Sequence, residues 1–269
     1  MIDMKTLTRG TYLGYQTDIL SYKNIIISKT QYKQNEDQNW HSHENSFFAY
    51  FLKGGNKELR KSNEIRCSAG TLLFYKAGEL HCNKDYTSGC RIFHVEIDKD
   101  WFVENNLNPE NIKPDEINSL IAKNIFVNII REFSIRDELS ESSMQSLILY
   151  LFNLLTRHSD WKKFAPSWIH NFDKIINERT TTQQSLTNIA KKLNVHPVTL
   201  SREFPKYYNC TFGEYVRQLR IEKILPMLAR KSIPISDIAE YCGFADAGNF
   251  IRCFKKLKGI TPDAYRKLL

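Results

Sequence analysis

The sequence lacks the features that mark a secreted, membrane-spanning or disulfide-stapled protein. Its longest apolar run, LILYLFNLL at 147–155, is too short to cross a bilayer. The first residues contain no apolar segment of the signal-peptide type. The six cysteines form no C-x-x-C pair and no regular ladder, which favours reduced thiols over disulfides. We therefore expect a cytoplasmic protein with no membrane partner.

Acidic side chains are scarce in the last part of the chain. Residues 161–269 hold 19 Lys and Arg against 9 Asp and Glu, whereas residues 1–160 hold 19 against 21. Such an asymmetry indicates a polyanionic partner for the C-terminal part alone, although a basic surface with no partner is the alternative. The 269 residues suffice for two domains, and a hydrophobic share of 42% is typical of folded proteins.

The periodicity of apolar residues predicts an α+β protein. Residues 1–100 contain short runs rich in β-branched and aromatic residues, separated by turn residues, which indicates a sandwich or barrel. The period then becomes helical at 115–136 and 141–157. A polar segment at 157–166 marks a domain boundary. We predict a β domain at 1–110, a helical linker with a dimerisation role at 111–160 and an all-α domain at 166–269.

The all-α part contains an internal repeat. An apolar stripe at positions i, i+3, i+4 and i+7 recurs 49 residues later, first in Leu186, Ile189, Ala190 and Leu193 and then in Ile235, Ile238, Ala239 and Cys242. A short turn follows each stripe, and Gly243 can supply a positive φ in the second. A second helix with basic residues comes next. This order predicts two helix-turn-helix motifs.

A helix at 211–229 is expected to connect the two motifs. It opens with a capping box of Thr211 and Glu214. A rigid connector would hold the two reading helices about 34 Å apart, one turn of B-DNA, on the same side of a duplex. Two prolines interrupt this pattern. Pro205 predicts that the first reading helix ends or kinks there, and Pro226 predicts a bend in the connector.

Residues 166–269 resemble the DNA-binding domain of the AraC/XylS family of bacterial transcription regulators. The motifs that carry the resemblance are IAEYCGF at 238–244, FKK at 254–256 and TPDAYR at 261–266. It implies that bases are faced by Val198, Thr199, Ser201 and Arg202 in the first reading helix and by Ala247, Gly248, Asn249 and Arg252 in the second. Arg202 and Arg252 are the strongest candidates, because Arg is the commonest partner of guanine. Phosphate contacts are expected from Lys206, Lys255, Lys256 and Lys258.

Two N-terminal segments, WHSHENSFF at 40–48 and GTLLFYKAGELHCN at 70–83, resemble the two motifs of cupin β-barrels. The resemblance brings His41, His43 and His81 together, a set that a divalent metal could use. However, Phe47 and Phe48 occupy the places of the cupin carboxylate ligand, so we expect no metal and no cofactor. A small-molecule pocket in the barrel mouth is predicted instead, lined by Trp40, His41, His43, Phe48, His81 and His94.

These observations predict a DNA-binding transcription regulator, and the resemblance favours an activator. The expected partners are double-stranded promoter DNA and a small-molecule effector, with RNA polymerase and a second copy of the chain as further candidates. We do not expect an enzyme, but two alternatives stay open. One is a metal-dependent cupin enzyme fused to a DNA anchor. The other is an architectural protein that binds DNA without sequence choice.

Overall fold

The N-terminal half consists of two sheets stacked face to face. The computed structural model describes residues 5–61, 63–112, 117, 120–161, 166–177, 185–208 and 210–268. The large sheet has the strand order β2-β3-β10-β5-β8, with bounds Tyr15–Ser21, Ile25–Tyr32, Cys90–Ile97, Ser46–Lys53 and Leu72–Tyr75. The small sheet has the order β1-β4-β9-β6-β7, with bounds Lys5–Leu7, His41–His43, His81–Lys84, Lys57–Arg60 and Glu64–Arg66. Within these described residues, each strand pairs only with strands of its own sheet, and no strand pairing joins the two sheets. The predicted α+β class is therefore confirmed, but a closed barrel is not.

Strand β5 separates two apolar clusters, because successive side chains of a strand point to opposite faces. Phe47, Ala49 and Phe51 belong to the cluster between the two sheets. Phe48 and its even-numbered neighbours face the helices instead, and the Phe48 ring lies 5.7 Å from that of Phe126 and 5.3 Å from that of Phe152. The large sheet thus has one face toward the small sheet and the other under helices.

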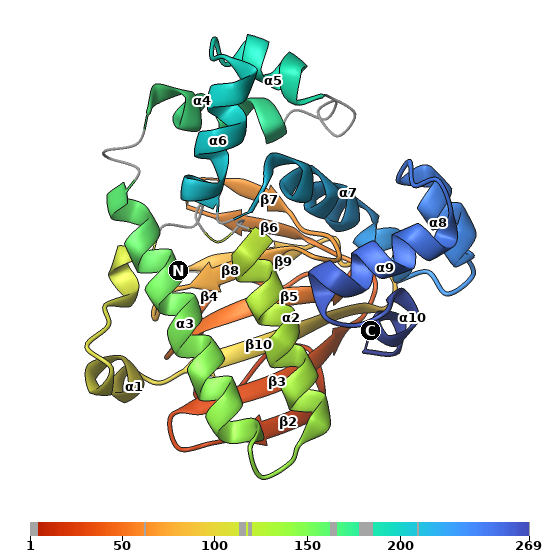
Figure 1. Ribbon diagram of the computed structural model, residues 1–269. Coiled ribbons are helices and arrows are strands. Elements are labelled where there is room, and N and C mark those ends of the chain that lie inside the picture. The colour runs from red at the N-terminus through yellow and green to blue at the C-terminus, as the bar shows by residue number, and fades with distance from the viewer. Residues whose placement is uncertain are drawn as a thin grey trace.

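Helices α2 and α3 cover the outer face of the large sheet (Figure 1). Their bounds are Leu120–Ile135 and Ser140–Trp161, and they follow α1 at Lys99–Glu104 and a 3₁₀ turn, η1, at Pro109–Asn111. They correspond to the two helices predicted at 115–136 and 141–157. Of the predicted boundary segment 157–166, residues 157–161 belong to α3, and 162–165 lie outside the described residues, as do positions 115, 116, 118 and 119 of the first helix prediction.

The C-terminal part is helical, as predicted. Its helices are α4 Ser167–Asn177, α5 Leu186–Lys192, α6 Pro197–Tyr208, α7 Phe212–Leu228, α8 Ile235–Tyr241, α9 Ala247–Lys258 and α10 Pro262–Leu268. Helix α6 does not end at Pro205 and runs on for three residues. The carbonyl of Ser201, which Pro205 cannot bond, belongs to an exposed residue and can be hydrated. Helix α7 likewise continues past Pro226. No helix in the described part of the chain is long and apolar enough to cross a membrane.

The two helix-turn-helix units belong to different cores. Helices α4 to α6 and the start of α7 surround a cluster that includes Phe172, Phe204 and Phe212. The rest of α7 and helices α8 to α10 share one continuous cluster with the large sheet, α2 and α3. Figure 1 shows α9 and α10 against α2, whereas α4, α5 and α6 lie at the other end of α7. The second unit is therefore joined to the N-terminal half by apolar packing.

Candidate DNA-binding surface and sensor cavity

The same turn is built twice, by different residues. After α5 the amide of Val195 donates to the carbonyl of Ala190 at 3.0 Å, and after α8 that of Phe244 donates to Ala239 at 3.0 Å. Each turn needs one residue with positive φ, which is Asn194 at 56° in the first copy and Gly243 at 72° in the second. Asn tolerates this conformation better than most residues with a side chain. The structure therefore contains the helix-turn-helix repeat that the sequence predicted.

In the first reading helix, α6, the predicted base-facing side chains lie on the outer surface. Val198 is 65% exposed, Ser201 and Arg202 are exposed, and Thr199 is half-buried. Glu203 introduces a negative charge beside them. Its carboxylate lies 3.1 Å from Nε of Arg202 and 2.8 Å from Nζ of Lys206, which is also exposed. These pairs are at the surface and can be exchanged for other partners at small cost.

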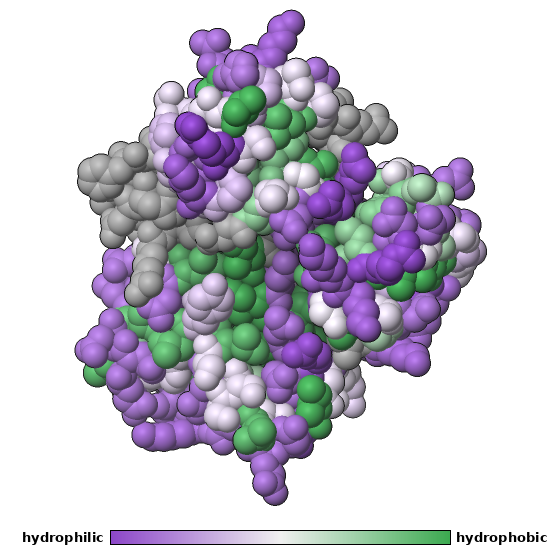
Figure 2. Space-filling model, viewed as in Figure 1, coloured by the Kyte–Doolittle hydropathy of each residue, from purple (hydrophilic) through white to green (hydrophobic). Residues whose placement is uncertain are grey.

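The second reading helix, α9, is capped by Asp246, whose carboxylate accepts from the amide of Asn249 at 2.6 Å. Asn249, Arg252 and Lys255 are exposed, whereas Ala247 and Gly248 are half-buried. Figure 2 shows hydrophilic side chains over α9 on this face of the molecule. Lys256 is exposed as well and pairs with Glu214 of α7 at 3.1 Å. The helix therefore presents polar and basic groups to solvent and buries its phenylalanines.

Lys258 does not match its prediction as a phosphate contact. Its side chain is only 2% exposed, and its ammonium pairs with Glu222 of α7 and donates to Asn124 of α2 at 3.0 Å. The apolar packing of α9 against α2 turns this side of α9 inward. In this arrangement Lys258 cannot reach DNA, and the prediction is corrected accordingly.

Two arginines of the connecting helix were missed in the sequence. Arg217 and Arg220 of α7 line an open cleft together with Asn249, Arg252 and Lys256 of α9. Their three-residue spacing places them on one face of α7, and this was the signal available from the sequence. A cleft with four cationic side chains beside the second reading helix suits a phosphate backbone.

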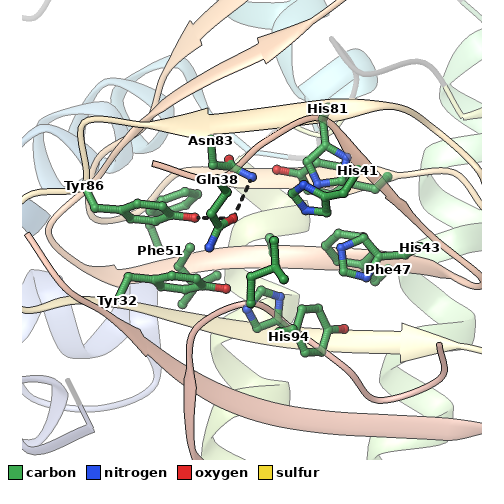
Figure 3. Close-up of a pocket in the computed structure, with 15 residues that line it drawn as sticks. Tyr32, Gln38, His41, His43, Phe47, Phe51, His81, Asn83, Tyr86 and His94 are labelled. Carbon is green, nitrogen blue, oxygen red and sulfur yellow. Dashed lines mark hydrogen bonds between the residues drawn. The ribbon is translucent and has the colours of Figure 1, made fainter. Parts of the chain in front are cut away.

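A second site lies between the two sheets, in a cavity of about 20 Å³, which is room for little more than a water molecule (Figure 3). Four of the six predicted residues line it: His41 and His43 on β4, His81 on β9 and His94 on β10. Phe48 does not line the cavity, because alternation along β5 sends it to the helices and places Phe47 there instead. Trp40 is also absent from the lining. Other cavity residues that the prediction missed include Tyr12, Gln38, Asn83 and Tyr86.

The imidazoles of His41, His43 and His81 converge in this cavity. One ring nitrogen from each lies within 4.8 Å of the others, and all three residues are buried. Nδ1 of His41 is 2.8 Å from the carbonyl of Asn39, and Nδ1 of His81 is 3.0 Å from that of Glu79. These carbonyls accept from Nδ1–H, so that each Nε2 carries a lone pair, the tautomer that metal-binding histidines use.

Burial keeps these rings neutral. Burial and the charges of neighbouring imidazoles lower the pKa of His43 to about 2 and that of His81 to about 3. Burial alone lowers the pKa of His94 to about 3. Three neutral imidazoles fit a zinc-class ion, which they could hold with one position open. Among the described residues no carboxylate joins this group.

Several buried polar atoms of the cavity have no partner in the described structure. They are both ring nitrogens of His94 and Nε2 of Gln38. Tyr12 stacks on His94 at 3.9 Å and donates its hydroxyl to Glu96 at 3.2 Å, which closes one side of the cavity. Buried polar groups are normally hydrogen-bonded. The arrangement therefore suits a small polar occupant that pairs with His94 and Gln38.

Comparisons with known proteins agree with the C-terminal architecture. A family model described as a helix-turn-helix domain matches residues 189–268. The chain is 36% identical over 109 residues to an uncharacterized HTH-type transcriptional regulator, YtdP of Bacillus subtilis, a match to 40% of this chain and 14% of that protein. It is 37% identical over 82 residues to the probable transcription factor PqrA of Proteus vulgaris, covering 30% of this chain and 67% of PqrA.

One full-length similarity includes the N-terminal half. The HTH-type transcriptional activator RhaR of Pectobacterium carotovorum is 22% identical over 290 residues, which cover 98% of both chains. By contrast, this chain spans less than half the length of several relatives that match its C-terminal part, including YtdP. The shared region is thus chiefly the helical one.

Proposed function

The chain belongs to the AraC/XylS family of bacterial transcription regulators, and from this premise we propose that it binds promoter DNA sequence-specifically as an activator. The observation that carries the proposal is the duplicated turn, with Val195–Ala190 and Phe244–Ala239 hydrogen bonds of equal length. Two such units on one connecting helix suit two successive major grooves. We propose RNA polymerase as a further partner. We also propose that a second copy of the chain binds through residues 111–160.

The exposed faces of α6 and α9 would read the bases. Arg202 and Arg252 are assigned to guanine and Asn249 to adenine, since these are the pairs that side-chain geometry favours. Val198, Thr199 and Ser201, with Ala247 and Gly248, would contribute shorter contacts. Phosphates would be held by Lys206, Lys255, Lys256, Arg217 and Arg220. Their charge supports affinity without sequence preference.

The N-terminal half would act as the sensor. We assign it as a cupin-like unit at 1–110, followed by the linker 111–160 and the DNA-binding domain 166–269. Its cavity favours a small uncharged molecule, because no Lys, Arg, Asp or Glu is found in the described lining and the histidines are neutral. Hydroxyl groups would suit His94 and Gln38, since a hydroxyl both donates and accepts.

The enzyme alternative rests on the convergence of His41, His43 and His81. It requires stoichiometric metal after purification, and turnover that disappears when His81 is changed to Ala. We expect instead that dialysis against a chelator leaves sequence-specific DNA binding unchanged. The relatives are transcription regulators by name, which supports a non-enzyme, although one of them is named as a bifunctional transcriptional activator and DNA repair enzyme.

Selection of genomic fragments by the purified chain, at about physiological salt, tests the proposal. Enrichment of a motif with two boxes roughly ten base pairs apart is expected. A variant carrying both Arg202→Ala and Arg252→Ala should lose this enrichment but retain weak binding to random duplex. Equal binding of wild-type protein to all fragments would support the architectural alternative and contradict the proposed function.

A further inference from the structure

Glu203 is the only acidic residue of the first reading helix, α6. Its side chain is 20% exposed, whereas those of Arg202 and Lys206 beside it are 73% and 61% exposed. Leu200, one turn earlier, is fully buried, so Glu203 lies at the edge of the buried stripe of the helix. A carboxylate at this place repels the phosphates of DNA. Its contacts indicate which role offsets that repulsion.

The carboxylate of Glu203 contacts the guanidinium of Arg202 through Nε. This nitrogen donates to Oε1 of Glu203 at 3.1 Å. A guanidinium carries five N–H donors in one rigid plane, and its two terminal amino groups lie beyond Nε. These two groups can donate to O6 and N7 of guanine. A guanine and Glu203 can therefore bind the same guanidinium from two sides, and neither contact has to break for the other to form.

The contact between Glu203 and Lys206 is of a different kind. The ammonium of Lys206 lies 2.8 Å from Oε2 of Glu203. An ammonium on a flexible stem can turn from an exposed carboxylate to a phosphate at small cost. The hydrogen bonds from Lys206 and Arg202 lower the pKa of Glu203, so the carboxylate is ionised at neutral pH. On DNA, Lys206 can thus move to a phosphate while Glu203 keeps its contact with Arg202.

The second reading helix, α9, provides an internal comparison. The offset of 50 residues that aligns Arg202 with Arg252 also aligns Glu203 with Cys253. Cys253 is half-buried, and it lines the open cleft together with Arg252 and two arginines of α7. Arg252 thus has cationic neighbours in the cleft, whereas Arg202 has a carboxylate on its Nε. The two arginines assigned to guanine therefore differ in how their side chains are held.

We propose that Glu203 is a positioning residue, which holds the guanidinium of Arg202 toward the major groove and so sharpens the preference of the first unit for guanine. The inference rests on the proposed function, in which Arg202 contacts that base. Restraining a long side chain before binding reduces the conformational entropy that is lost on binding. Where the interface excludes water, the charge-assisted contact on Nε is also stronger than it is in solvent.

Two substitutions of Glu203 separate its hydrogen bond from its charge. Glu203→Gln removes the charge but retains an oxygen that can accept from Nε of Arg202. Glu203→Met has a similar length and no such oxygen. Both variants should bind random duplex more tightly than wild type, because one repelling charge is gone. Only Glu203→Met should relax the preference for guanine, by about twofold to tenfold, the effect of releasing one restrained side chain.

The test uses the full-length protein in two measurements. Fragment selection at about physiological salt gives the base preference at each position, and fluorescence anisotropy with random duplex gives the non-specific affinity. Glu138→Gln removes the same charge at an exposed position between α2 and α3, and this matched control should change neither result. Arg202→Ala, alone and combined with Glu203→Met, completes a double-mutant cycle. Once Arg202 is gone, Glu203→Met should have no further effect on base preference.

Three results would overturn the positioning role. One is a guanine preference that Glu203→Met leaves unchanged. Another is equal relaxation by Glu203→Gln and Glu203→Met, which would assign the effect to charge. The third is a change in preference that persists in the Arg202→Ala background, because Glu203 would then contact a base itself. A wild-type protein that selects no motif would instead overturn the proposed function, and with it the assignment of Arg202 to guanine.

Discussion

Lys256 and Lys258 are two residues apart on α9, yet their side chains are 73% and 2% exposed. Two positions correspond to about 200° around a helix, which places them on opposite sides. Lys256 faces solvent beside the arginines of α7, whereas Lys258 faces α2. Both lysines were expected to contact phosphate from the family resemblance, but the packing of α9 gives them different roles. Substituting each in turn separates these roles.

Replacing Lys256 with Ala should weaken binding to the selected duplex and to random DNA by the same factor. A phosphate contact contributes affinity without reading sequence, and its loss reduces the number of counterions released. The slope of log K against log salt should become shallower by about 0.9. Anisotropy titrations at four or more salt concentrations measure this. A slope equal to that of wild type would show that Lys256 does not contact phosphate.

Replacing Lys258 with Met should lower stability and leave the salt slope of DNA binding unchanged, because the ammonium of Lys258 contacts Glu222 and Asn124 instead of solvent. Among the described residues, the substitution leaves the carboxylate of Glu222 paired with the ammonium of Lys123, at 3.6 Å. Breaking one partner from a buried ion pair costs about 3–5 kcal/mol, and Lys123 should reduce this loss. Urea unfolding measures the change. Lys255→Met, at an exposed position of the same helix, is the matched control and should cost little.

Replacing Arg252 with Ala should reduce affinity for the selected duplex by about 1–3 kcal/mol and relax the preference at one base pair. Random DNA should be affected much less, because an arginine that reads a base loses its specific partner there. Repeating the fragment selection with the variant identifies the relaxed position. An equal loss on selected and random DNA would instead place Arg252 on a phosphate.

The sequence was most informative where a period or a motif determines geometry. The duplicated stripe and turn predicted both helix-turn-helix units, including the positive φ at Gly243. The sequence was least informative about strand register, where a shift of one residue decides which side chain faces the cavity. Phe47 and Phe48 are equally apolar, and only the pairing of β5 with β8 and β10 decides which of them lines the cavity. The burial of Lys258 likewise depends on a helix more than a hundred residues away, which no local pattern encodes.

The cavity histidines should make the protein sensitive to acid. The pKa values of His43, His81 and His94 are lowered to between about 2 and about 3, whereas in the unfolded chain each ring titrates near its ordinary value of about 6.5. Below about pH 6.5 the unfolded chain binds protons that the folded protein does not. Stability is therefore full above this pH and falls on acidification, by up to about 1.4 kcal/mol per pH unit for each ring.

Urea unfolding at pH 7, 6 and 5, with chelator present to keep the rings free of metal, measures this dependence. His94→Phe removes one such ring while retaining an aromatic partner for Tyr12. The stability of this variant should fall less steeply as the pH is lowered. The difference in slope from wild type should correspond to one proton, up to about 1.4 kcal/mol per pH unit. The same slope in wild type and variant would mean that His94 is protonated in the folded protein.

Replacing Phe204 with Ala should unfold the first helix-turn-helix unit selectively. Phe204 is fully buried, and its ring packs against those of Phe172 and Phe212 in a cluster that does not include α8 to α10. Truncation of a buried Phe costs about 3–5 kcal/mol, which is a large share of the stability of so small a unit. Hydrogen exchange should accelerate in α5 and α6 but not in β5 or β10.

The matched control is Phe126→Ala, which truncates an equally buried ring in the cluster that joins α2 to the large sheet. It should accelerate exchange in β5 and in α10 together, since these elements share one core. If Phe204→Ala instead destabilises all elements equally, the two cores unfold as one cooperative unit. The second unit would then be held by the first as well as by α2.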